Sequence, residues 1–207
     1  MKKDKQKAKR KEFCYAIKMR LFIVLAFILF HGCSSNEEEA TNTAITESQD
    51  PEVNLPLIQT PAPLIHLADN LDEQDQLGWC IDTRGNGFNE NLHTHSCKAS
   101  GGDVQFIYNE ETLQICSVEF TGYCVEMSGG PIVGMSLSLV ESNTDSPDQR
   151  FVYNESSGEF NPEEDTSLCM AAGNTSAAAG IYMSRSLTLE ISSETEENLK
   201  KWVIVSN

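Results

Sequence analysis

Basic residues are scarce in most of this chain of 207 residues. Nine of its 15 Lys and Arg residues lie within the first 33 positions, which leaves six for the rest, whereas that rest holds 29 of the 31 Asp and Glu residues. An acidic surface repels phosphate backbones, so the composition argues against nucleic acid as a partner. The charge favours solubility and does not decide the fold.

The sequence also lacks the short motifs of common catalytic sites. It contains no G-x-S-x-G nucleophile elbow, no H-E-x-x-H zinc motif and no glycine loop of the kind that binds phosphate. Gly101-Gly102 and Gly129-Gly130 are typical of turns. We therefore expect no enzyme activity, no catalytic residue and no cofactor, and we expect binding to be the activity of the chain.

The apolar run near the N-terminus is too short to cross a bilayer. Leu21–Phe30 has ten residues, and a spanning helix needs about 20. A basic stretch precedes the run and Gly32-Cys33 follows it, as in a signal peptide. This end resembles the lipobox of bacterial lipoproteins. The resemblance implies that residues 1–32 are a cleaved signal peptide and that acylated Cys33 anchors the protein to the bacterial cell envelope, at the outer membrane or cell surface. An ordinary signal peptide cut elsewhere, or an uncleaved anchor, stays open.

Residues 33–76 lack a sustained apolar period. They contain Glu37-Glu38-Glu39, stretches rich in Thr, Ser and Asn, and prolines at 51, 56, 61 and 63. This composition cannot bury enough surface to offset chain entropy, so we expect a flexible tether. The segment Leu55–Leu67 is more apolar, and part of it could pack on the folded domain. We expect His66 to lie at the surface.

One pattern occurs three times in residues 77–207. The copies open with Cys80-Ile81-Asp82, Cys124-Val125-Glu126 and Cys169-Met170-Ala171. Cys124 follows Cys80 by 44 residues, and Cys169 follows Cys124 by 45. Each copy ends near an aromatic residue, at Phe106, Phe151 and Trp202. Short alternating runs between turns rich in Gly, Asn and Asp predict strands, hence an all-β domain with repeats at about 77–120, 121–165 and 166–207.

Five cysteines follow Cys33, so at least one is unpaired within the chain. Cys80 and Cys97 stand at the two ends of one motif, and we expect them to form a disulfide, which contributes about 3 kcal/mol for a loop of this size. Cys116 and Cys124 flank a turn and could close a hairpin. Cys169 is then a buried thiol, although the pairing of these last three stays open.

The pattern of Cys-apolar-Asp, an alternating strand ending in Cys, and Gln-x-aromatic resembles the ricin-type β-trefoil lectins. The resemblance implies twelve short strands with pseudo-threefold symmetry and places Phe106, Phe151 and Trp202 in the core. The glutamine of the motif is kept only as Gln149 and braces its repeat in this family. Val104 and Lys200 replace it in the other copies.

The resemblance also implies a carbohydrate-binding site in repeat 1. In the family, an Asp after the first Cys is the main polar anchor, an aromatic residue two positions before the second Cys is the platform for the sugar, and an Asn completes the polar set. Asp82, His95 and Asp103 hold these positions, with His93 beside the platform.

A weaker second site is implied in repeat 2. Glu126, Asp148 and Gln149 supply its polar groups, but a residue near Ser138 stands where the platform belongs. In repeat 3, Ala171 and a residue near Ser184 take the two main positions, so we expect no site there.

Alternation also puts His93, His95 and Cys97 on one strand face, which could bind a metal. Cys97 is better used in a disulfide, so we expect no metal.

The sequence as a whole predicts a surface-anchored carbohydrate-binding lipoprotein with a glycan or polysaccharide as partner. The alternative is a non-catalytic protein-interaction or toxin-associated subunit that keeps the trefoil but has lost sugar binding, similar in layout to the lectin-like component of the cytolethal distending toxin.

Overall fold

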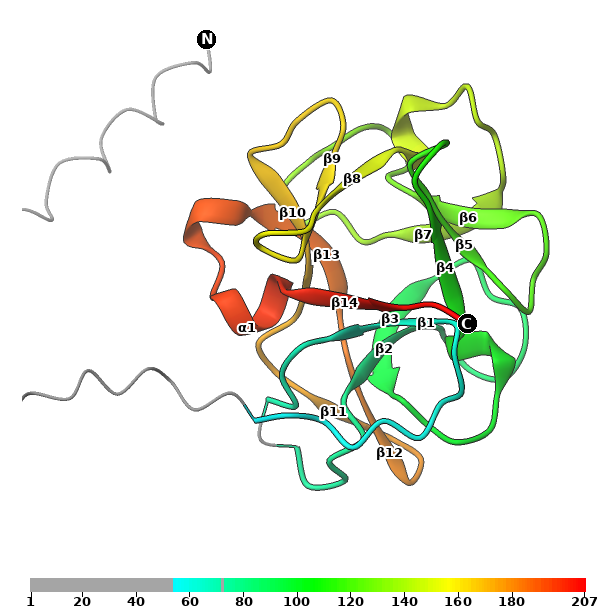
Figure 1. Ribbon diagram of the computed structural model, residues 1–207, viewed down its shortest axis with the longest axis vertical. Coiled ribbons are helices and arrows are strands. Elements are labelled where there is room, and N and C mark those ends of the chain that lie inside the picture. The colour runs from blue at the N-terminus through cyan, green and yellow to red at the C-terminus, as the bar shows by residue number, and fades with distance from the viewer. Residues whose placement is uncertain (1–53, 72) are drawn as a thin grey trace, which may run out of the picture. The chain divides into compact units, whose positions relative to one another are not determined.

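A computed structural model describes residues 54–71 and 73–207 (Figure 1). The expected signal peptide, Cys33 and the first part of the expected tether lie outside the described residues. No helix within the described ranges is long and apolar enough to cross a membrane.

Strands dominate the described part of the chain. They are β1 (Leu64–Leu67), β2 (Trp79–Thr83), β3 (Leu92–Ser96), β4 (Phe106–Asn109), β5 (Gln114–Ser117), β6 (Tyr123–Glu126), β7 (Ser138–Glu141), β8 (Phe151–Asn154), β9 (Glu159–Pro162), β10 (Leu168–Ala172), β11 (Ala177–Ala179), β12 (Tyr182–Arg185), β13 (Leu187–Ile191) and β14 (Trp202–Val205). Within the described residues, the helical elements are three 3-10 helices, at Gly102–Val104, Pro147–Gln149 and Ser192–Glu194, and one short α-helix, α1 (Glu197–Lys200). The predicted all-β class is confirmed.

The three sequence copies fold in the same way. Each opens with an antiparallel pair, namely β2 with β3, β6 with β7, and β10 with β13. The opening cysteines lie at equivalent positions of these pairs, where Cys80 faces His95, Cys124 faces Val140 and Cys169 faces Glu190. A second pair follows in each copy, made by β4 with β5, β8 with β9, and β14 with β1.

The pairing of β14 with β1 joins the two ends of the domain (Figure 1). Leu64 faces Val205, and Leu67 faces Trp202. The tether expected over residues 33–76 therefore does not include their last part, because β14 needs a partner for its backbone groups and takes it from this segment. The expectation that part of Leu55–Leu67 packs on the domain is confirmed. His66 is only 8% exposed, so its expected surface position is wrong, and burial lowers its pKa.

The aromatic residues of the repeats meet in the core, as predicted. Phe106 and Phe151 are 0% exposed and Trp202 is 1% exposed. The Oη atoms of Tyr108 and Tyr153 each donate a hydrogen bond of 2.9 Å, the first to the carbonyl of Phe151 and the second to that of Trp202. Each tyrosine thus ties its repeat to the core aromatic residue of the next.

Fourteen strands stand in the described ranges where the resemblance implied twelve. The two additional strands, β11 and β12, form a hairpin in the connection between β10 and β13. This hairpin pairs with β3 of repeat 1, where Ser184 faces His95. The expectation that Ser184 takes the place of His95 in repeat 3 is therefore wrong, since Glu190 occupies that place.

The expected disulfides Cys80–Cys97 and Cys116–Cys124 are both formed, with Cα atoms 5.2 and 3.9 Å apart. Cys169 is free and buried. Val104, which replaces the motif glutamine, is 0% exposed and packs in a cluster with Leu64 and the first disulfide.

Candidate functional site

A cleft of about 590 Å³ opens beside β3. Its lining comes from the loop after β2 (Gly85, Asn86, Gly87), from β3 and the loop after it (His93, His95, Lys98, Ser100, Gly101, Asp103), and from the β11–β12 hairpin (Ala179, Gly180, Tyr182). Three of the four residues expected for the repeat 1 site line this cleft. The fourth, Asp82, is 1% exposed and is not part of the lining.

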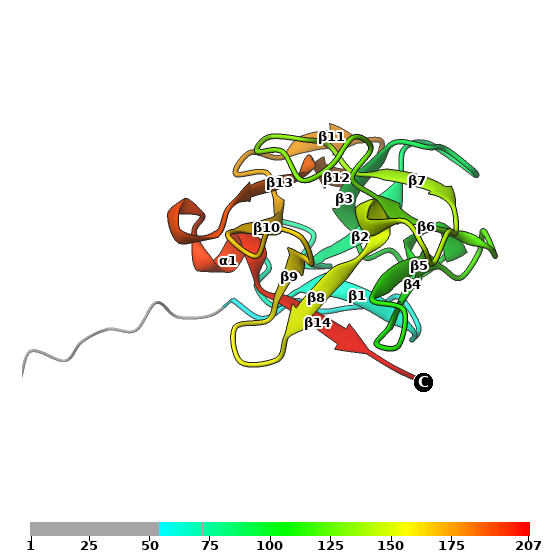
Figure 2. The ribbon, with the colours of Figure 1, turned by 90° about the horizontal axis from the view of Figure 1, so that it is seen from above.

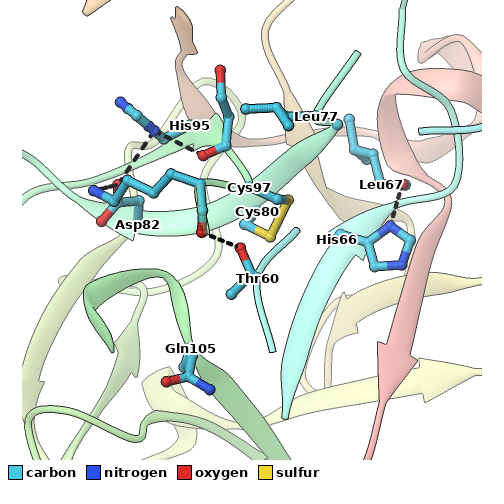
Figure 3. The surroundings of a disulfide bond; sticks show 12 residues. Thr60, His66, Leu67, Leu77, Cys80, Asp82, His95, Cys97 and Gln105 are labelled. Atoms are coloured by element: carbon cyan, nitrogen blue, oxygen red, sulfur yellow. Dashed lines mark hydrogen bonds and ion pairs between the residues drawn. A yellow bond between two sulfur atoms is a disulfide. The ribbon is translucent and has the colours of Figure 1, made fainter. Parts of the chain in front are cut away.

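Strand register brings the expected residues together. Asp82 on β2 faces His93 on β3, and the two-residue period places His95 on the same face as His93. Oδ2 of Asp82 lies 3.6 Å from Nδ1 of His95 and 4.0 Å from Nε2 of His93. Figure 3 shows Asp82 and His95 close together, with the Cys80–Cys97 disulfide near them. Asp103 joins from the 3-10 turn at Gly102–Val104.

Lys98 connects the two acidic residues, and sequence reasoning missed it. Its Nζ lies 3.2 Å from Oδ2 of Asp82 and 3.3 Å from the carboxylate of Asp103. Gly101 has a φ of 117°, and a Cβ there would lie 2.5 Å from Oδ1 of Asp103 and 2.8 Å from Cε of Lys98. A glycine is therefore needed for this arrangement. One feature of the sequence could have indicated Lys98 as a site residue, because it directly follows Cys97, the last residue of the motif.

Burial sets the protonation of the site. It raises the pKa of Asp82 to about 7, and repulsion from Asp103 adds to the rise, while Lys98 opposes it. Burial lowers the pKa of His93 to about 4, and the neighbouring His95 contributes to the fall. Burial also lowers the pKa of His95. Both histidines are therefore neutral at pH 7.

Several buried polar atoms of the site are left without a hydrogen-bond partner within the described part of the chain. They are Oδ1 of Asp82, Nε2 of His93 and Oδ1 of Asp103. The last lies near the Lys98 ammonium but receives no well-directed hydrogen bond from it. Buried polar groups normally have partners, and leaving one unpaired costs about 1–3 kcal/mol. The site thus offers hydrogen-bonding capacity that the fold itself does not use.

Tyr182 is the second lining residue that sequence reasoning missed. Its ring centroid lies 5.5 Å from that of His95, which lies 5.5 Å from that of His93. The tyrosine comes from the hairpin of repeat 3, and no pattern within repeat 1 could have indicated it.

The implied second site is arranged differently. Gln149 is 1% exposed, and its Nε2 donates to Oε2 of Glu126 and to the carbonyl of Glu141. Its Oε1 accepts hydrogen bonds from Nε2 of Gln114 and from the amide of Asn143. All the hydrogen-bonding groups of this side chain are in use, as the bracing role implied for it requires.

The remaining members of that second site do not complete it. The other carboxylate oxygen of Glu126 accepts a hydrogen bond from Ser128. Ser138 lies opposite Glu126, so it corresponds to His93 and supplies no ring. Asp148 is half-buried in the 3-10 turn before β8.

Cys97 cannot serve as a thiolate ligand in the metal site considered for His93, His95 and Cys97, because it forms a disulfide with Cys80. Within residues 54–71 and 73–207, no group of three or more His, Cys, Asp and Glu side chains is placed to hold a metal ion.

Comparison of the fold with solved structures gives clear matches. The agglutinin from Abrus precatorius superposes with a TM-score of 0.50 at 12% identity, over 71% of this chain and 48% of the agglutinin. The C-half of an earthworm R-type lectin, solved in complex with GalNAc, superposes with a TM-score of 0.50 at 12% identity, over 70% of this chain and all of the lectin chain. The domain has the β-trefoil fold of these lectins. The predicted fold is thus confirmed.

This β-trefoil spans about half the length of the agglutinin that it matches. A weaker likeness, with a TM-score of 0.42 at 14% identity, links it to the Haemophilus ducreyi cytolethal distending toxin and is too low to support an argument. No protein-family model matches the sequence, and no curated protein matches it either.

Proposed function

We propose that the trefoil binds carbohydrate in the cleft of repeat 1. One observation carries the proposal: unpaired, buried polar atoms of His93 and Asp103 lie in the same cleft as the ring of His95. Sugar recognition requires this combination, since fixed polar groups pair with hydroxyls while a flat ring covers the apolar face of the sugar.

The chemistry of the cleft suits neutral hydroxyl groups. A hydroxyl both donates and accepts, so it can donate to a carboxylate oxygen of Asp103 and accept from the ammonium of Lys98. Neutral His93 adds one further ring nitrogen for hydrogen bonding. Asp82 contributes by fixing Lys98, to which it is bound at 3.2 Å.

A glycan array tests this proposal. The full chain, purified in detergent, is compared with Asp103→Ala and with Asp148→Ala, which changes the equivalent turn in repeat 2. We expect the first substitution to abolish binding and the second to leave it unchanged, with native circular dichroism in all three proteins. Equal losses in both variants, or no binding by the folded wild-type chain, would contradict a sugar site in repeat 1.

The wider role that we propose is a surface-anchored lipoprotein that captures glycans or polysaccharide. It rests on the pattern of residues 1–33, with acylation at Cys33. Metabolic labelling with an alkyne analogue of palmitate tests it. We expect label and membrane fractionation in the wild-type protein and the loss of both in Cys33→Ala, whereas label that persists in the variant would contradict the anchor.

A second candidate function is binding of a protein partner by a trefoil that has lost sugar binding. One observation favours it: Phe88 is 48% exposed and lies against Phe120 and Tyr123, at centroid distances of 5.4 and 4.7 Å. This function requires that the folded protein bind no glycan on the array, so the same experiment separates the two functions.

A further inference from the structure

The β11–β12 hairpin brings part of repeat 3 to the cleft of repeat 1. Ser184 and Arg185 on β12 face His95 and Thr94 on β3. Figure 2 shows β12 beside β3. The hairpin lies in the connection between β10 and β13. Among the described residues, the equivalent connections, between β2 and β3 and between β6 and β7, contain no strand. One wall of the cleft is therefore specific to this pairing of repeats 1 and 3.

Two sets of contacts fix the base of the hairpin. The Oγ of Ser96 accepts a hydrogen bond of 3.0 Å from the amide of Met183 and donates one of 2.5 Å to Asp75. Arg185 binds Glu73 at 2.8 Å, donates to the carbonyl of Gly173 and lies 4.6 Å above the ring of Trp79. Contacts within the protein thus hold the hairpin in place, as a preorganised binding wall requires.

Tyr182 is the large side chain that this wall gives to the cleft. It is half-buried, and its lining neighbours in the hairpin, Ala179 and Gly180, are small. No hydrogen bond within the described ranges involves its hydroxyl group. The rings of His93, His95 and Tyr182 form a row that extends from repeat 1 onto the hairpin.

The polar groups of the cleft come from another element than Tyr182 does. Asp103 and Lys98 belong to the loop after β3, whereas Tyr182 belongs to β12. The cleft, at about 590 Å³, falls within the roughly 300–1,000 Å³ of sites that enclose drug-sized ligands. This volume leaves room for more than one sugar ring, and the polar groups and the Tyr182 ring come from two different elements. The cleft therefore suits an extended ligand better than a single sugar.

We infer that Tyr182 is the stacking platform of an outer subsite, so that the cleft takes a glycan chain of two or more sugar residues. The inner residue pairs with Asp103 and Lys98, and the next one stacks on Tyr182. This inference rests on the proposed function and deepens it. The hairpin of repeat 3 thereby adds a second ring beside that of His95 in repeat 1.

The test compares short and long glycans on Tyr182 variants of the full chain. Titration calorimetry measures binding of galactose, glucose and their N-acetylamino forms, and of two- and three-residue oligosaccharides built from them. We expect wild type to bind an oligosaccharide about tenfold more tightly than its single sugar, as one aromatic contact allows. Tyr182→Ala and Tyr182→Leu lose that gain and keep the affinity for the single sugar, whereas Tyr182→Phe retains both.

Ile181→Ala is the matched control, because Ile181 is the neighbouring hairpin residue and is 88% exposed. It should bind as wild type does. If Tyr182→Ala and Tyr182→Leu keep the full oligosaccharide affinity, or if wild type binds single sugars and oligosaccharides equally, the outer subsite is wrong while sugar binding stands. If folded wild type binds none of these sugars, the proposed function fails and the inference with it.

Discussion

The ammonium of Lys98 lies between two carboxylates, 3.2 Å from Asp82 and 3.3 Å from Asp103. The side chains of the three residues are only 12%, 1% and 11% exposed. Their charges therefore interact with little screening by solvent. Both carboxylates therefore share the charge of Lys98, which lines the cleft together with Asp103, whereas Asp82 does not.

Replacing Lys98 with Met should destabilise the protein strongly at pH 8. The two carboxylates would be left buried without a cation, and breaking a buried pair in this way costs about 3–5 kcal/mol. The loss should be smaller at pH 5, where a carboxyl group can take up a proton. Urea unfolding at both pH values measures it. Lys98→Arg keeps the charge and should lose less, and an equal loss for Lys98→Met at both pH values would contradict the pairing.

Ionisation of the Asp82 carboxyl group should lower the free energy of unfolding as the pH rises. Its pKa is raised to about 7, so the folded chain holds this proton more tightly than the unfolded chain does. The stability that it contributes is complete below about pH 4 and is lost as the pH rises to about 7. We expect Asp82→Asn to flatten the fall in unfolding free energy between pH 5 and pH 8. A fall that is unchanged in the variant would show that another group is responsible.

His93 should act in the opposite direction on the acid side. Its pKa is lowered to about 4, so the unfolded chain binds the proton first as the pH falls. The contribution of His93 to the free energy of unfolding is complete above about pH 6.5. Acidification to about pH 4 removes it and lowers that free energy by up to about 3 kcal/mol. His93→Gln should remove this part of the acid destabilisation in thermal melts. Asp148→Asn, at a half-buried position in repeat 2, is the control and should melt with the wild-type pH profile.

Lys200 and Glu159 form an ion pair of 3.0 Å where repeat 2 pairs Gln149 with Gln114 at 2.8 Å. Gln114 and Glu159 open the equivalent strands β5 and β9, and Lys200 precedes Trp202 as Gln149 precedes Phe151. Lys200→Gln alone leaves a carboxylate facing an amide, in a pair whose side chains are each 13% exposed. Lys200→Gln with Glu159→Gln recreates the amide pair of repeat 2.

We expect a coupling free energy of at least about 1 kcal/mol between Lys200 and Glu159 in a double-mutant cycle, with the double variant more stable than Lys200→Gln. The comparison pair is Arg150 with Glu163, whose side chains are 29% and 40% exposed. Such an exposed pair should contribute less than about 1 kcal/mol. If the two pairs couple equally, the Lys200–Glu159 pair does not have the structural role of the glutamine pair.

The site shows how far local pattern reaches. The positions of Asp82, His93, His95 and Asp103 follow from one motif and from strand alternation, and the structure brings all four residues together. Lys98 was visible beside Cys97, but nothing in the sequence indicated that its side chain turns back to Asp82. Tyr182 lies 87 residues after His95, so only the pairing of β12 with β3 places its ring at the cleft.

The sequence alone determined the three repeats, through the spacing of their opening cysteines, and the Cys80–Cys97 pair, which stands at the two ends of one motif. The core positions of the aromatic residues were implied by the family resemblance. The tertiary structure decided the rest. It placed Leu64–Leu67 against the last strand and brought the β11–β12 hairpin onto repeat 1. Both are pairings between distant segments, made through backbone hydrogen bonds that any residue except proline can form, so the residues involved carry little trace of them.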